Sequence, residues 1–217
     1  MTPDPLAVLT GDLVGSSRLG GTALDAAMAV LGEAAGATAN WAGDGPPARF
    51  TRFRGDGWQC LAPSPALSLR MMLFLRARLR ARGADLDTRI SAGIGPGRLP
   101  ATGDLSAGAG PAFETSGHGL DSLGRAARLG LDWPGGPAAP AVLAALVALC
   151  DEVSRRWTPR QARVFAARLV PDAPPQAEIG AEFGISQQMV AKHLRSGGDW
   201  ALRRALAALE GGTGDDE

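Results

Sequence analysis

The chain has 217 residues, of which 22 are basic and 22 acidic, so its formal net charge is zero. This balance excludes the uniform positive field with which histone-like and polybasic proteins bind polyanions. Hydrophobic residues make up 45% and charged residues 20% of the chain, which is typical of a globular protein and not of a disordered one. The length accommodates one large domain or two small ones. A net charge of zero leaves little self-repulsion, which favours a homodimer.

The cysteines and apolar runs indicate a soluble protein of the cytoplasm. Cys60 and Cys150 both lie in apolar surroundings and are interpreted as small buried hydrophobic residues. The N-terminal residues lack the basic segment of a signal peptide. The longest apolar run, residues 141–150, is too short for the roughly 30 Å of hydrocarbon in a bilayer. We therefore expect no membrane partner.

The hydrophobic pattern predicts an α+β fold. In chain order it predicts a strand at 6–10, a helix at 22–35 and a hairpin at 49–61 around an Asp-Gly turn. An amphipathic helix at 64–82, with its arginines on the face opposite its apolar residues, and a strand at 88–94 follow. This β-α-β-β-α-β order is that of the ferredoxin-like arrangement. A run rich in Gly and Pro at 133–140 then indicates a linker, and the pattern from Val142 onward is helical.

Two aspartates occupy positions that suit a metal site. Asp12 ends the first strand, and Asp56 lies at the tip of the hairpin between two glycines. Because the first strand and the hairpin are neighbours in this topology, both carboxylates could hold Mg²⁺ or Mn²⁺ against phosphates. Gly15, Ser16 and Ser17 follow Asp12 and could cradle those phosphates with backbone N–H groups. The alternative is that Asp56 is only a turn residue and that a serine only caps a helix.

Several segments carry a resemblance to a known family. Residues 6–17 and the Phe-Arg-Gly-Asp-Gly at 53–57 resemble the metal-binding segments of class III nucleotide cyclases and related palm-type nucleotidyl transferases. With the segments at 110–113, 128–133 and 156–161, the chain is similar to the SatD family. That family joins a cyclase-like domain to a C-terminal helix-turn-helix. The resemblance implies a nucleotide ligand as well as the metal ion.

One helix departs from the cyclase pattern. Active class III cyclases carry an Asn and, four residues later, an Arg that orient the ribose and stabilise the transition state. The corresponding positions on a helix at 110–120 are Glu114 and His118. A carboxylate would repel phosphate, and a histidine helps only when it is protonated. The alternative is that His118 is an ordinary, partly buried histidine with no role in binding. The resemblance therefore implies nucleotide binding without cyclisation by the usual mechanism.

The charge is unevenly distributed, and its basic part coincides with a motif. Residues 153–209 contain nine basic and four acidic residues, a net charge of +5, whereas the tail at 210–217 carries −4. Within the basic part, 175–195 reads as two short helices with Gly184 at the turn. Val190 and Leu194 would face inward. The side chains expected to point toward DNA are those of Ser186, Gln187, Gln188, Lys192 and Arg195.

The surrounding arginines fit the same interpretation. Six of them could contact phosphates: Arg155, Arg156, Arg160, Arg163, Arg203 and Arg204. The segment is similar to the four-helix unit of sigma-factor region 4. The alternative is a helical bundle used only for dimerisation.

These observations predict four segments and two competing functions. The segments are a cyclase-like domain at 1–133, a linker and connecting helix at 134–156, a helix-turn-helix domain at 157–209 and an acidic disordered tail at 210–217. The first function is a transcriptional regulator that binds double-stranded DNA and senses a nucleotide with Mg²⁺. The second is a two-metal nucleotidyl transferase or cyclase with Asp12 and Asp56 as catalytic candidates.

Overall fold

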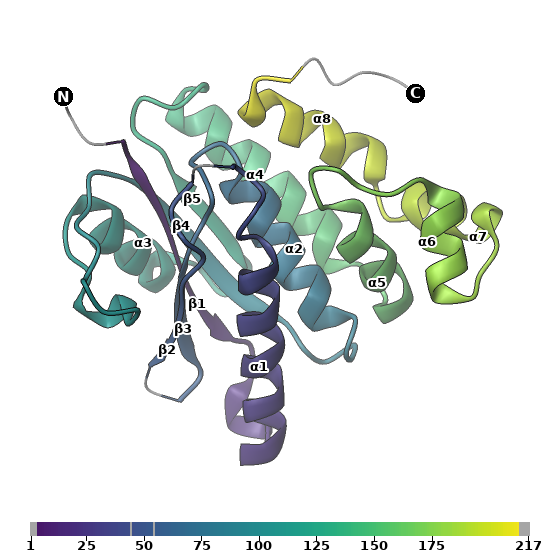
Figure 1. The fold of residues 1–217 in the computed structure, drawn as a ribbon, viewed down its shortest axis with the longest axis horizontal. Coiled ribbons are helices and arrows are strands. Elements are labelled where there is room, and N and C mark those ends of the chain that lie inside the picture. The colour runs from purple at the N-terminus through teal and green to yellow at the C-terminus, as the bar shows by residue number, and fades with distance from the viewer. Residues whose placement is uncertain (1–3, 44, 54, 213–217) are drawn as a thin grey trace.

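A computed structural model describes residues 4–43, 45–53 and 55–212, which fold into a mixed α+β structure around a five-stranded sheet (Figure 1). The strands are β1 (Leu6–Leu13), β2 (Phe50–Phe53), β3 (Gly57–Leu61), β4 (Thr88–Gly95) and β5 (Leu129–Asp132). Their order across the sheet is β2-β3-β1-β4-β5. All neighbouring strands are antiparallel except β4 and β5, which are parallel.

The helices lie between and after these strands in the chain. The α-helices are α1 (Gly21–Ala37), α2 (Ser68–Arg80), α3 (Pro111–Ser122), α4 (Pro140–Arg155), α5 (Pro159–Arg168), α6 (Gln176–Phe183), α7 (Gln187–Ser196) and α8 (Asp199–Glu210). Two short 3₁₀ turns are η1 (Ser16–Arg18) and η2 (Leu105–Ala107). Within the described ranges, none of the helices is both long enough and apolar enough to cross a membrane.

β1 is the central strand, and both of its faces are covered. Leu9 and Leu13 belong to the larger core cluster, which also contains residues of α1 and α2. Val8 belongs to a smaller cluster with Ala112 and Phe113 of α3. Alternate side chains of a strand point to opposite faces, so a strand covered on both sides has a continuous run of apolar residues in its sequence. Residues 6–9 form such a run.

α3 lies unusually close to the sheet because small residues face each other there. A Cβ added at Gly93 of β4 would lie 2.5 Å from backbone atoms of α3, and one at Gly119 would lie 2.2 Å from Ser91 Oγ. The buried hydroxyls of Thr10 and Ser116 form a hydrogen bond of 2.8 Å across this contact. Glycines at these positions thus set the distance between helix and sheet.

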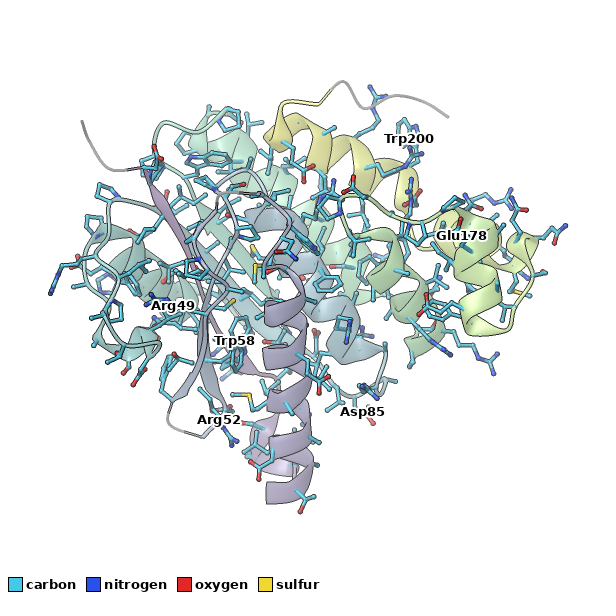
Figure 2. The ribbon with its side chains drawn as sticks, viewed as in Figure 1. Arg49, Arg52, Trp58, Asp85, Glu178 and Trp200 are labelled. Carbon is cyan, nitrogen blue, oxygen red and sulfur yellow. The ribbon has the colours of Figure 1, made fainter. Side chains whose placement is uncertain are left out.

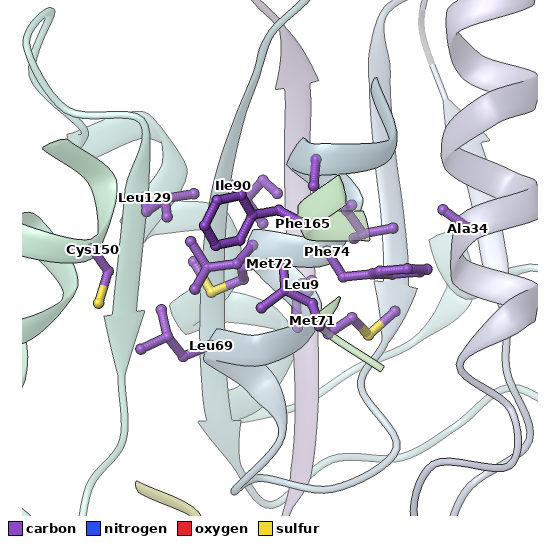
Figure 3. Packing of buried hydrophobic residues seen from close by; sticks show 14 of the residues in the cluster. Leu9, Ala34, Leu69, Met71, Met72, Phe74, Ile90, Leu129, Cys150 and Phe165 are labelled. Carbon is purple, nitrogen blue, oxygen red and sulfur yellow. The ribbon is translucent and has the colours of Figure 1, made fainter. Parts of the chain in front are cut away.

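One continuous core joins the sheet to the C-terminal helices. Figure 3 shows Phe165 of α5 and Cys150 of α4 in the same packed group as Met72 and Phe74 of α2. The indole of Trp157 stacks on the ring of Phe165, with centroids 4.2 Å apart. Apolar packing therefore extends from β1 through α2 to α8 without a break among the described buried residues.

The arginines of α2 differ from the sequence-based expectation, which placed them on a separate polar face of this helix. The structure places three of them against the C-terminal helices. Arg70 binds Glu210 of α8 through two hydrogen bonds of 2.8 and 2.7 Å. Arg76 is fully buried, and Arg80 donates to the Trp157 carbonyl at 2.8 Å. The side of α2 that reads as polar in the sequence is therefore largely covered, and Arg70, Arg76 and Arg80 are bound by α8, α4 and nearby loops.

Two boundaries were not anticipated in the sequence. β5 is too short, at four residues, to give an alternation pattern, and it pairs with β4 in parallel. Glu210, the first residue assigned to the acidic tail, is the last residue of α8. The rest of that predicted tail from position 213 onward lies outside the described residues.

Candidate nucleic-acid interface

The α6–α7 pair is held at a sharp turn by two glycines. Gly184 follows α6 in the left-handed conformation, with a φ of 67° that favours glycine. A Cβ added at Gly180 would lie 2.7 Å from the carbonyl oxygen of Ile185, so the turn passes directly over α6. The Ile185 amide donates to the Gly180 carbonyl at 2.9 Å. The chain therefore reverses within a few residues and directs α7 across α6.

α7 separates two buried apolar side chains from its exposed polar ones. Val190 and Leu194 are buried, in agreement with the predicted inward positions. The Ser186 hydroxyl accepts the Met189 amide at 3.2 Å and caps the helix. The polar side chains predicted to point outward are all exposed: Ser186, Gln187, Gln188, Lys192 and Arg195. Met189 is exposed beside them.

α7 is fixed to the rest of the molecule at its C-terminal end. Trp157 donates from its indole N–H to the Gly197 carbonyl at 2.9 Å. Gln161 of α5 donates to the Ser196 hydroxyl at 3.0 Å. The same Gln161 completes a capping box with Thr158 at the start of α5. The outer face of α7 is thus presented by a helix whose position is set by buried contacts.

Some arginines around α7 already contact carboxylates or aromatic rings of the chain, and others do not. Arg156 binds Glu152, and Arg203 binds Asp199 at 3.1 Å. Arg163 lies over the Phe183 ring at 4.2 Å. Arg155 contacts Asp151 and Glu152, and Arg204 lies over Trp200. Most of the six arginines expected to contact phosphates are therefore already bound within the chain.

Arg160, Lys192 and Arg195 are the available cations of this region. All three are exposed, and across the part of the chain that the structure describes they form no ion pair. Trp200 of α8 is also exposed, at 61%, and projects from the end of α8 nearer to α6 (Figure 2). The region therefore combines uncompensated cations with hydrogen-bonding amides on one helix face.

The Asp12 carboxylate is occupied by a neighbouring arginine. Asp12 and Arg89 are direct partners in the register of β1 and β4. Arg89 donates from Nε to Asp12 Oδ1 at 2.9 Å and from Nη2 to Asp12 Oδ2. The Asp12 backbone carbonyl accepts a further bond from the Thr88 hydroxyl at 2.7 Å. Both carboxylate oxygens thus already have a cationic donor.

Arg89 is influenced by the charges of three aspartates, of which Asp12 is the direct partner. Its hydrogen bonds to Asp12 raise the pKa of its guanidinium above the ordinary value; burial opposes this, and the charges of Asp12, Asp121 and Asp56 add to it. Asp56 lies in the turn immediately before β3, and β3 pairs with β1. The charges of both predicted metal ligands thus act on Arg89.

As arranged, the Asp12 carboxylate is already paired with a guanidinium. Mg²⁺ or Mn²⁺ at Asp12 would have to replace Arg89 or share the carboxylate with it through the remaining lone pairs. Among the described residues, no three His, Cys, Asp or Glu side chains gather as a metal site requires. The guanidinium of Arg89 supplies the positive charge that a metal ion would bring.

The loop after Asp12 forms the turn η1. Gly15 has a φ of 68°, and the space beside it is filled by the Arg18 guanidinium, 2.4 Å from where a Cβ would lie. Ser16 is half-buried and Ser17 is exposed. An anion at this loop would therefore meet the Arg18 guanidinium as well as backbone N–H groups.

Glu114 and His118 both lie on α3, which confirms the predicted helix. Both side chains are exposed. The sheet-facing side of α3 carries Ala112, Ser116 and Leu120. The alternative of a partly buried histidine is therefore wrong for His118, because position 118 falls on the outer side of the helix.

The sequence analysis missed Arg89 as the partner of Asp12. A sequence signal for this ion pair was present, because antiparallel pairing of the strands at 6–10 and 88–94 allows a cross-strand ion pair. The strand register was needed to identify the two partners.

In comparisons with known proteins, no protein-family model and no curated protein sequence matches the chain.

Proposed function

We propose that the protein is a DNA-binding transcriptional regulator and that α6 and α7 form its helix-turn-helix. In this proposal α7 enters the major groove with its N-terminal half. The sheet and its helices are a ferredoxin-like, cyclase-like sensory domain of the SatD type. The observation that carries the proposal is the outer face of α7, where two glutamines and two unpaired cations stand exposed behind a capped helix start.

Each of these side chains has a chemical role on DNA. Gln187 and Gln188 have the paired donor and acceptor that matches the major-groove edge of adenine. Lys192 and Arg195 lie one turn or more further along the helix and reach guanine or phosphate. Arg160 supplies a further phosphate contact from the start of α5. A homodimer would present two such helices to successive major grooves, about 34 Å apart.

The proposal is tested by equilibrium binding of a fluorescently labelled DNA duplex library. Lys192→Ala combined with Arg195→Ala should weaken binding by at least about thirtyfold, since each lost cation contact contributes roughly 1–3 kcal/mol. The matched control is Arg98→Ala with Arg125→Ala, which removes the same charge from exposed positions outside the α7 region. Equal affinity of the wild type and the α7 double variant would refute the assignment.

The competing candidate is a metal-dependent nucleotidyl transferase or cyclase. It is supported by the charges of Asp12 and Asp56, which both act on Arg89, and weakened by the pairing of Asp12 with Arg89. Incubation with each nucleoside triphosphate and Mg²⁺ or Mn²⁺, followed by chromatography, separates the two functions. We expect no product; a product that disappears in Asp56→Ala would establish the enzyme instead.

A further inference from the structure

A wide groove lies apart from both α7 and Asp12. It has a volume of about 720 Å³ and is bounded by the end of α1, by α2, by α5 and by α6. This volume is within the range of pockets that hold small organic ligands, about 300–1,000 Å³. The groove therefore lies where helices of the sheet region meet the helix that precedes α7.

Positive charge dominates the rim of the groove. Arg78, Arg82 and Arg163 line it, against a single acidic residue, Glu182. No ion pair of these three arginines occurs in the ranges that the structure covers, unlike those of Arg70, Arg76 and Arg80 on the same α2 helix. Their guanidinium donors thus remain available to a bound anion.

Aromatic rings orient two of these guanidinium groups. Arg163 lies over the ring of Phe183 at 4.2 Å, and Arg78 lies over the ring of Phe74 at 5.7 Å. A guanidinium held flat on a ring keeps its N–H edge free, and that edge matches the two oxygens of a carboxylate or phosphate. Between the arginines the lining is apolar, with Ala166, Ala167 and Val170 of α5 and its following loop.

We propose that this groove binds a small organic anion that carries a flat apolar group. The anionic end would be held by Arg163 and Arg78, with Arg82 at the open side, and the flat group would lie on the alanines of α5. Nucleoside phosphates and aromatic carboxylates share this chemistry. The inference concerns a site separate from α7 and does not depend on DNA binding.

The first test uses anilinonaphthalene sulfonate, a flat apolar anion whose fluorescence rises on binding. We expect saturable binding of one probe per chain, weakened at least about tenfold by Arg163→Ala, since a hydrogen bond to a charged group contributes about 1.5–3 kcal/mol. Arg160→Ala is the matched control, because Arg160 is exposed on the same helix but does not line the groove. Equal probe affinity in the two variants, at unchanged thermal stability, would overturn the proposal.

The second test identifies the class of ligand by displacement. Adenosine and guanosine phosphates form one arm, and benzoate and salicylate form the other; displacement in either arm supports the site and selects its chemistry. Benzyl alcohol and inorganic phosphate are controls that carry only the ring or only the charge. Displacement by benzyl alcohol as effective as by benzoate, or failure of both arms, would contradict the assigned role of the arginines.

Discussion

Arg76 is the residue that ties the sheet region to the C-terminal helices. Its side chain is fully buried and binds Asp87 through Nε and Nη2, at 2.9 and 2.8 Å. Its remaining nitrogen donates to Asp151 at 2.7 Å and to Ser154 at 3.0 Å, both on α4. Burial alone lowers the pKa of Arg76, but the carboxylates of Asp87 and Asp151 more than reverse this, so its pKa lies above the ordinary value.

Arg76→Met should therefore be severely destabilising. Methionine keeps much of the side-chain volume but leaves Asp87 and Asp151 with only the longer ion pairs to Arg80 at 3.6 Å and Arg155 at 3.5 Å. Breaking a buried pair in this way costs about 3–5 kcal/mol. Urea unfolding followed by circular dichroism measures the change. Arg82→Met, at an exposed position of the same part of the chain, should change the free energy of unfolding by no more than about 0.5 kcal/mol. Similar losses in both variants would contradict the role given to Arg76.

For individual residues, the sequence indicates which side chains are charged but not which of them form ion pairs with each other. Arg76 and Arg89 each bind partners far away in the chain, Asp151 and Asp12. The outward residues of α7 were predicted, because helical periodicity depends only on local spacing. The pairing of Asp12 with Arg89 depends on strand register, which no local pattern determines.

The α6–α7 turn is the element on which the proposed interface depends. Its geometry follows from the short distance between Gly180 and the Ile185 carbonyl and from the left-handed Gly184. The sequence predicted this turn because a turn glycine and a capping serine determine backbone geometry within a few residues of themselves. By contrast, β5 gave no recognisable signal, since it exists through parallel pairing with β4.

Gly180→Ala should push the turn away from α6. The added methyl group would lie 2.7 Å from backbone, which cannot give way as a flexible side chain does, and such overpacking costs about 1–3 kcal/mol. Gly117→Ala is the control within a helix, because no atom lies within 4 Å of its Cβ position. It should stabilise the protein by roughly 0.5–1 kcal/mol. Thermal unfolding of both variants measures this; destabilisation by Gly117→Ala as large as by Gly180→Ala would contradict the steric argument.

The larger of two core clusters extends from the sheet to the C-terminal helices, although the charges and helices suggested separate parts. Buried residues of β1, α2, α5 and α8 all belong to it. The α+β class was predicted, since it follows from periodicity. The way α5 and α8 pack on α2 was not, because its arginines read as a solvated face while Arg70 and Arg76 bind Glu210 and Asp151.

The zero net charge of the whole chain does not describe how charge is distributed in the folded molecule. The basic excess at 153–209 is partly neutralised inside the fold, as in the pairing of Arg203 with Asp199 and of Arg156 with Glu152. Among the described residues of 153–209, Arg160, Lys192 and Arg195 are exposed cations without an ion pair. DNA binding by this protein should therefore depend on a small number of defined contacts.

The salt dependence of DNA binding tests this account most directly. Each phosphate contact adds about 0.9 to the slope of the logarithm of the binding constant against the logarithm of salt concentration. The slope for Lys192→Ala with Arg195→Ala should be shallower than that of the wild type by up to about two. The control pair, Arg98→Ala with Arg125→Ala, should keep the wild-type slope. Identical slopes for the wild type and the α7 double variant would contradict the placement of α7 on DNA.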